Sequence, residues 1–267
     1  GTTEVNILHL SALQVWPMGG KGGMPSLRET LRGHVQAGYH VELIVPRYDL
    51  FSDDTHSLGI REGEGYKVHV AECRWFPLFS RGRAMARRLS GGDAIAYPAR
   101  WILNLGMLLC LTISLYFKAR RVCGERFVPD AVYAHNQYAA LAGFFLRCVW
   151  RVPNVTRLYG TFLADLMEKP LVAVRYPTAA AGFLVPSSLL ICGNDGTRGD
   201  EVARRLGVCR ERFRFWQNGV EPPENAPAVT RGEFVVRFAG LGLRPECKWA
   251  ISRSEEHTSE LQSLLII

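Results

Sequence analysis

Four polar turns, each placed directly after a run of apolar residues, carry the side chains best suited to chemistry. The turns are His135-Asn136, Gly160-Thr161, Asn194-Asp195 and Asn218-Gly219. Imidazole, amide and hydroxyl groups donate and accept hydrogen bonds, and histidine can also move a proton near neutral pH. Each turn alone is explained by the ordinary preference of turns for asparagine and glycine. Their repetition after successive apolar runs favours a binding site.

A glycine-rich loop near the N-terminus is a second candidate binding element. Its glycines are Gly19, Gly20, Gly22 and Gly23. Glycine lets the backbone approach a ligand closely, and the N-terminus of a following helix offers free N–H groups and a partial positive charge. The loop is not a P-loop, because Gly22 follows Lys21, and Pro25 stands where the dinucleotide fingerprint needs its third glycine. By itself the loop fits a flexible surface turn as well as a ligand site.

The order of apolar runs predicts an α/β fold. Strands are expected at Asn6–Leu10, Val41–Val45, Lys67–Ala71, Pro129–His135, Asn154–Leu158, Leu189–Cys192 and Phe213–Trp216. Helices are expected at Ser26–Ala37, Tyr138–Trp150 and Asp200–Leu206, with a further helix opening at Phe162–Glu168. Unbroken apolar strands alternating with helices are typical of a parallel sheet that is covered on both faces. We therefore predict a Rossmann-like, doubly wound parallel sheet with helices on both faces, whose strand ends bring the polar turns and the glycine loop to one edge.

Trp101–Phe117 is the most hydrophobic segment and carries no charge, although basic residues flank it on both sides. A membrane-spanning helix needs about 20 apolar residues, whereas this run is shorter and contains Asn104, Thr112 and Ser114. We expect a buried helix that covers the sheet. Shallow insertion into an anionic membrane surface is the second interpretation and a true span the third. The preceding segment, Arg74–Arg100, is expected to be irregular and basic. We favour a solvated loop and helix there, and a basic surface that faces a phosphate or lipid headgroups is the alternative.

The bulk properties are those of an ordinary globular protein, with 48% hydrophobic and 21% charged residues. The net charge of +7 favours anionic partners such as a nucleotide, a phosphate or an anionic membrane surface. We expect no nucleic-acid partner, because the sequence has no basic region interleaved with aromatics, no zinc-finger spacing and no RNA-recognition motif. The seven cysteines are scattered without a C-x-x-C motif, which favours reduced thiols in a cytoplasmic protein.

The ordered motifs resemble the N-terminal half of a glycosyltransferase family 4 enzyme, a retaining, nucleotide-sugar-dependent transferase of GT-B fold. The matching stretches are MGGKGGMPSLRETLRG with QAGYHVELIVP, PDAVYAHNQ, VPNVTRLYGTFL, LICGNDGTRGDEVARRLGV and RFRFWQNGVEPP. They follow the order found in the family, from about Asn6 to Pro223. In this family an NGV turn followed by an acidic residue, here Glu221, usually marks the crossing from the first Rossmann-like domain to the second.

This resemblance implies the roles of the candidate residues. The first domain would bind a saccharide or lipid-linked acceptor, with the glycine loop near the donor diphosphate. The residues that match cleft-facing strand ends are His135, Asn136, Gly160 and Thr161. We assign His135 as a candidate catalytic residue, although a purely structural hydrogen-bonded histidine is the alternative. The other turn and loop residues, with Asn194 and Asn218, are candidate substrate-binding residues. No metal or cofactor is expected, since fixed cations and a helix N-terminus would neutralise the leaving diphosphate.

The chain departs from this family pattern after the first domain. We expect the acceptor-side domain at residues 1–222, a linker at 223–240 and a stub of the nucleotide-sugar domain at 241–252. Arg253–Ile267 matches the in-frame translation of a common sequencing adapter, and we expect it to be unstructured or spuriously helical. The chain would then be a fragment with little activity of its own. A non-catalytic binding module for a phosphorylated ligand and a membrane-associated protein built on Trp101–Phe117 remain alternatives.

Overall fold

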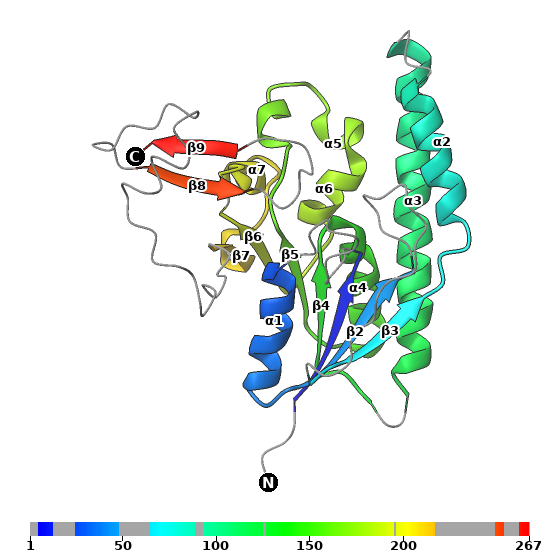
Figure 1. The fold of residues 1–267 in the computed structure, drawn as a ribbon, viewed down its shortest axis with the longest axis vertical. Coiled ribbons are helices and arrows are strands. Elements are labelled where there is room, and N and C mark those ends of the chain that lie inside the picture. Colours follow the sequence, from blue (N-terminus) through cyan, green and yellow to red (C-terminus); the bar gives the residue numbers. More distant parts are fainter. Residues whose placement is uncertain are drawn as a thin grey trace, which may run out of the picture.

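A seven-stranded parallel β-sheet forms the centre of the molecule (Figure 1). The computed structural model describes residues 5–12, 25–47, 65–88, 93–124, 127–194, 196–216, 249–253 and 262–266. The strands are β1 (Asn6–Ser11), β2 (His40–Pro46), β3 (Lys67–Ala71), β4 (Ala131–His135), β5 (Asn154–Leu158), β6 (Leu189–Gly193) and β7 (Phe213–Trp216). Their order in the sheet is β3-β2-β1-β4-β5-β6-β7. The order reverses between β1 and β4, which is where doubly wound sheets open a crevice at their carboxyl ends.

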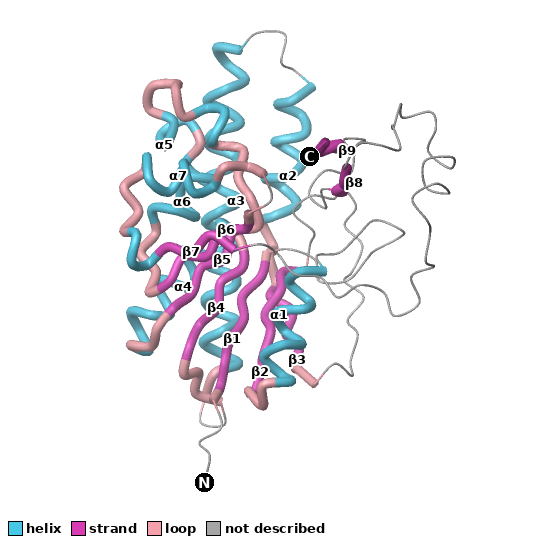
Figure 2. The backbone as a smooth tube through the Cα atoms, turned by 90° about the vertical axis from the view of Figure 1, so that its left-hand side faces the viewer, coloured by secondary structure: helices cyan, strands magenta, loops and turns pink. Residues whose placement is uncertain are grey.

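Helices cover both faces of this sheet (Figure 2). On one face lies α1 (Pro25–Gln36), whose Leu27 and Leu31 pack on the odd-numbered residues of β2. On the other face lie α3 (Asp93–Val122), α4 (Gln137–Trp150), α6 (Pro177–Leu184) and α7 (Gly199–Arg205). Side chains along each strand alternate between these two faces, so both faces can be apolar within one short run. The predicted fold class, a Rossmann-like doubly wound parallel sheet, is confirmed.

The segment Arg74–Arg100 differs from its prediction. It forms α2 (Phe76–Arg88) and the first turns of α3, which pair as a helical hairpin. The reason is packing: Phe76 and Phe79 lie three residues apart on one face of α2 and join the cluster that contains Met107 of α3. The two helices approach closely at Gly106, where an added Cβ atom would lie only 2.5 Å from the Phe79 ring. Glycine at this position therefore makes room for the ring. The prediction of irregular structure for this segment is therefore wrong.

The hydrophobic segment Trp101–Phe117 lies within α3, and it is buried on one side only. Met107, Leu111 and Leu115 are fully buried against the sheet and its neighbouring helices, whereas residues on the opposite side of the helix are exposed. The expectation of a buried helix that covers the sheet therefore holds for that one side of α3.

Short elements complete the described chain. The helix expected at Phe162–Glu168 is only a 3-10 turn, η1 (Ala164–Leu166), because the chain turns again before a full helix can form. Two helices that we did not predict, α5 (Val172–Arg175) and α6, follow it, and η2 (Arg210–Arg212) precedes β7. Near the C-terminus, β8 (Trp249–Arg253) pairs antiparallel with β9 (Gln262–Ile266). Within the tail that we expected to be unstructured or helical, residues 253–267, the structure describes Gln262–Ile266 as a strand. The domain boundaries stay predictions.

Candidate functional site

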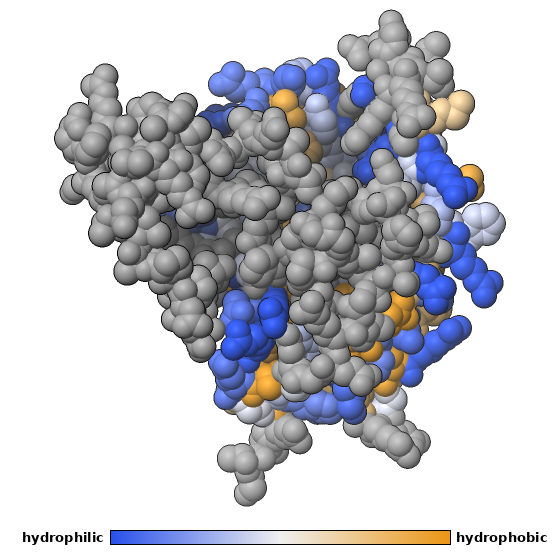
Figure 3. Space-filling model, viewed as in Figure 1, coloured by the Kyte–Doolittle hydropathy of each residue, from blue (hydrophilic) through white to orange (hydrophobic). Residues whose placement is uncertain are grey.

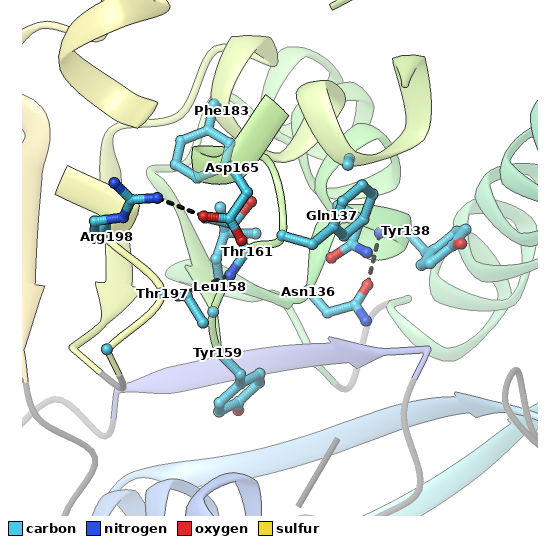
Figure 4. Close-up of a pocket in the computed structure, with 14 residues that line it drawn as sticks. Asn136, Gln137, Tyr138, Leu158, Tyr159, Thr161, Asp165, Phe183, Thr197 and Arg198 are labelled. Atoms are coloured by element: carbon cyan, nitrogen blue, oxygen red, sulfur yellow. Dashed lines mark hydrogen bonds and ion pairs between the residues drawn. The ribbon is translucent and has the colours of Figure 1, made fainter. Parts of the chain in front are cut away.

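A pocket of about 430 Å³ opens at the carboxyl ends of β4, β5 and β6 (Figure 4). Its polar lining comes from the turns that follow these three strands and from η1. The residues of these turns and of η1 that line it include Asn136, Gly160, Thr161, Asp165, Thr197 and Arg198. An apolar wall is added by Phe162 and by Ala179 and Phe183 of α6. A concave site with an apolar wall and a few convergent polar groups is the usual form of a small-molecule site.

Asn136 joins the end of β4 to the start of α4. Its backbone has φ 71° and ψ 165°, a conformation outside the left-handed helical region that residues other than glycine rarely adopt. Its side-chain oxygen accepts a hydrogen bond from the backbone N–H of Tyr138 at 2.7 Å, so it caps α4. Its own backbone N–H donates to the carbonyl oxygen of Arg157 at 2.7 Å. These bonds fix the position of the turn on the pocket wall.

The turns after β5 and β6 are tied together by two threonines. The backbone N–H of Thr161 donates to the Thr197 hydroxyl at 3.0 Å, and the Thr161 hydroxyl accepts from the backbone N–H of Leu163 at 3.1 Å. Gly160 has φ 153°, which few residues other than glycine adopt. The floor of the pocket is therefore a braced pair of turns.

A positive charge lies at the rim of the pocket. Arg198 follows Thr197, is about half exposed and forms an ion pair with Asp165 at 2.5 Å (Figure 4). The Asp165 side chain is 83% exposed, and exposed ion pairs contribute little free energy. An anionic group of a ligand could therefore take the place of the Asp165 carboxylate on the guanidinium at small cost.

His135 does not line this pocket. It is fully buried on the sheet face that α1 covers, and both of its ring nitrogens have partners. Nε2 lies 2.8 Å from Nδ1 of His9, and Nδ1 lies 2.7 Å from the hydroxyl of Tyr159. The chain continues from Nε2 of His9 to Nδ1 of His34 on α1, at 3.0 Å. Tyr159 also lines the pocket, so its hydroxyl links the His135 ring to that site.

The histidine chain is held neutral by its surroundings. Burial lowers the pKa of His9, His34 and His135, and the nearby Arg157 guanidinium lowers all three further. Burial likewise raises the pKa of Tyr133, whose ring stacks on His9 and His135. A neutral imidazole donates from one nitrogen and accepts at the other, so the chain can keep a single donor-to-acceptor direction from end to end.

The structure brings together three of the predicted site residues, Asn136, Gly160 and Thr161. Asn194 follows β6 as predicted, but its backbone N–H donates to the Trp216 carbonyl and it is not among the pocket residues. The glycine-loop positions and Asn218 lie outside the described residues. Sequence reasoning missed Thr197, Arg198 and Asp165. The first two follow the predicted turn after β6 directly, whereas nothing in the local sequence marks Asp165.

Comparison with known proteins supports the fold. No protein-family model matches the chain, and no curated protein matches it in sequence. Among solved structures, Arabidopsis thaliana UGT89C1 complexed with UDP-L-rhamnose matches with a TM-score of 0.50 and 12% identity, over 92% of this chain and 56% of that one. Anabaena HepE in complex with UDP and glucose matches with a TM-score of 0.45 and 17% identity, over 82% and 45% of the two chains.

A third match is sucrose-phosphate synthase from Thermosynechococcus elongatus, with a TM-score of 0.47 and 13% identity, over 79% of this chain and 47% of that one. The chain thus spans about half the length of the solved structures that it matches. At this level of identity the likeness concerns the fold alone. It agrees with the Rossmann-like α/β architecture described above.

Proposed function

We propose that this chain is the acceptor-side domain of a nucleotide-sugar-dependent glycosyltransferase that acts with retention. The observation that carries the proposal is the pocket at the carboxyl ends of β4, β5 and β6, beside the point where the strand order reverses. Ligands of open parallel sheets bind in that position. UDP-L-rhamnose, which is named with the UGT89C1 structure above, belongs to this class of donor.

In this proposal the pocket receives the acceptor, which is a saccharide or a lipid-linked sugar. The aromatic rings of Phe162 and Phe183 offer an apolar wall for the C–H face of a sugar, and the braced turns offer polar groups to its hydroxyls. Arg198 attracts the negative charge of a phosphate or diphosphate group. The chemistry benefits from such a cation, because the leaving nucleotide diphosphate gains negative charge as the glycosidic bond breaks.

The remaining parts of the proposal concern the protein beyond this pocket. A second domain would hold most of the nucleotide sugar, so the chain alone is proposed to have little transferase activity, since one wall cannot exclude water or align two substrates. No metal or other cofactor is proposed to be needed. The cysteines that the structure describes are free thiols, which suits the proposed cytoplasmic location.

The second candidate is a non-catalytic module that binds a phosphorylated ligand. The observation that favours it is Arg198, a half-exposed cation whose nearer carboxylate partner, Asp165, is highly exposed, while Glu201 lies 3.7 Å away on α7. Such a module would bind phosphate-bearing molecules through Arg198 without any affinity for the sugar part.

Calorimetric titration of the 267-residue chain tests the two candidates. The ligands are neutral oligosaccharides, sugar phosphates, short-chain polyprenyl-phosphate sugars and UDP-, ADP- and GDP-sugars. We expect a saccharide or a lipid-linked sugar to bind. Arg198→Gln should lower the affinity for phosphorylated ligands about tenfold, which is the effect of losing one hydrogen bond to a charged group. The matched control is Arg204→Gln on α7, an exposed arginine that does not line the pocket and should change nothing.

Two results would count against the transferase proposal. One is binding of phosphorylated molecules through Arg198 with no contribution from the sugar, which is the signature of the binding module. The other is binding that no pocket substitution alters. Transfer of labelled sugar at an enzyme-like rate by this chain alone would contradict the need for a second domain.

A further inference from the structure

The long helix α3 presents an apolar stripe that the proposed function does not use. Its members are Ile102, Leu109, Ile113 and Phe117, whose exposed fractions lie between 45% and 61%. They are seven, four and four residues apart, which places them on one side of the helix. The opposite side of α3 is the buried one that packs on the rest of the domain.

The stripe continues onto α4 through a series of aromatic contacts. The rings of Phe117 and Tyr116 lie 5.3 Å apart between centroids, and those of Tyr116 and Phe145 lie 6.4 Å apart. Phe145 and Val149, one turn apart on α4, are both more than 40% exposed. We call the six exposed side chains on α3 and α4 the apolar face: Ile102, Leu109, Ile113, Phe117, Phe145 and Val149. Single exposed apolar residues need no explanation, but a connected set of this kind marks an interaction site.

Positive charge borders this apolar face at the C-terminal end of α3. The sequences of α2, α3 and α4 contain many basic residues and one acidic residue, Asp93 at the start of α3. Arg120 lies three residues after Phe117, on the same side of α3, and Arg121 beside it is also exposed. The acidic residue nearest to the start of α2 in the sequence, Glu72, is paired with Arg47 at 2.7 Å. Figure 3 shows hydrophilic and hydrophobic side chains mingled along the edge where α2 and α3 lie.

An apolar stripe bordered by cations and nearly free of carboxylates is complementary to an anionic lipid surface. Apolar side chains of such helices enter the boundary between headgroups and acyl chains, while arginine and lysine contact the lipid phosphates. We infer that the apolar face of α3 and α4 rests on an anionic bilayer surface, with α3 lying along the membrane. This inference goes beyond the proposed function and does not depend on it.

The packing of α3 distinguishes this arrangement from a membrane span. Among the described helices, the part from Pro98 to Val122 is long and apolar enough to cross a membrane by length and composition, and 33% of its most apolar window is buried. Its buried side, however, packs on the sheet and on α4 through Leu111, Leu115 and Ala119. A spanning orientation would pull these side chains out of the core, whereas a surface orientation leaves them in place.

Flotation of the whole 267-residue chain with lipid vesicles tests the inference. One set of vesicles contains phosphatidylcholine only, and the other contains about a third phosphatidylglycerol. We expect partition into the anionic vesicles to exceed that into the neutral ones by about tenfold or more, and to fall as salt is raised.

Matched variants locate the contact on the protein. Ile113→Gln with Phe117→Gln removes apolar area from the stripe, and its control is Trp216→Gln, an exposed aromatic on β7 at the opposite edge of the sheet. Each pair or single variant is checked for an unchanged thermal unfolding profile. We expect the stripe variant to lower partition about tenfold and the control to stay within about twofold, since buried apolar area contributes to interfacial binding.

A charge-reversal pair tests the cationic border in the same way. The test variant carries Arg120→Glu and Arg121→Glu in the last turn of α3. The control carries Arg204→Glu in α7 and Arg210→Glu in η2, and so has the same change of net charge. The first pair should lower anionic-vesicle partition about tenfold or more, and the second should lower it much less.

Several results would overturn the inference. These are no flotation with either vesicle, equal flotation with both, or an equal loss in the stripe variant and its control. A dimer in sedimentation velocity that the stripe variant dissociates, without any vesicle binding, would instead assign the apolar face to contact between two copies of the chain.

Discussion

Acidification is expected to destabilise the fold through its buried histidine chain. His9 and His135 are fully buried, and burial lowers the pKa of both, with added repulsion from His34 and Arg157. In the unfolded chain the same groups have their ordinary pKa of about 6.5. Below that pH the unfolded chain binds protons that the folded chain does not. The stability that these groups contribute is therefore complete above about pH 6.5 and is lost as the pH falls toward their lower folded pKa.

The size of the effect follows from linkage. One group that is protonated only in the unfolded state changes the free energy of unfolding by about 1.4 kcal/mol per pH unit. The two fully buried histidines together give a slope of up to about 2.7 kcal/mol per unit below the unfolded pKa. A domain has about 5–15 kcal/mol of stability in all, so one pH unit is a measurable part of it. Unperturbed carboxyl groups titrate near pH 4 and contribute little between pH 5.5 and 7.5.

Urea unfolding at half-unit steps from pH 5.5 to 7.5 measures this slope. His9→Phe with His135→Phe keeps aromatic rings in the stack with Tyr133 and removes the two fully buried titrating groups. Most of the slope should therefore disappear, and the remainder is expected from His34, whose pKa is also lowered by burial. Tyr133→Phe is the matched control, because it alters the same stack but removes no group expected to titrate in this range, and it should keep the slope. Stability that is flat or rises on acidification, or a slope that persists in the double variant, would refute the reasoning.

Three further substitutions test the packing and the pocket. Gly160→Ala should cost about 1–3 kcal/mol in urea unfolding, because its φ of 153° strains any other residue, and an unchanged midpoint would contradict this. Gly199→Ala should lower the free energy of unfolding by a similar amount, since its Cβ would lie 2.3 Å from the Cys192 sulfur. Adding Cys192→Ala to this variant should recover part of the loss, and additive losses would argue against the contact. Asp165→Asn should change stability by less than about 1 kcal/mol yet strengthen phosphate binding at Arg198, measured by titration, and weaker binding would exclude the proposed exchange of partners.

The sheet could be predicted from sequence because its strands are buried on both faces. Apolar runs such as Leu189–Cys192, bounded by glycine and polar turns, favour strands of a sheet that is covered on both faces. The hairpin of α2 and α3 could not be predicted in the same way. The arginines around Arg81 made the segment look solvated, whereas the contact between Phe79 and Gly106 that holds it together joins residues far apart in sequence.

The candidate site was predicted in part. Asn136, Gly160 and Thr161 were found because parallel strands end at one edge, which depends only on topology. His135 was misjudged as a cleft residue, since it is the last residue of β4 and follows the alternation that turns its ring toward α1, the same side as Tyr133. The pairing of Arg198 with Asp165 depends on how two turns approach each other in space. That approach cannot be predicted from the local sequence of either turn.

Backbone amide chemical shifts recorded during titration with saccharides and lipid-linked sugars show whether the carboxyl-edge pocket receives a sugar acceptor. We expect the shifts to cluster at residues 136–138, 159–162 and 196–198. Shifts that gather on another face of the domain, or no shifts with any sugar, would contradict it.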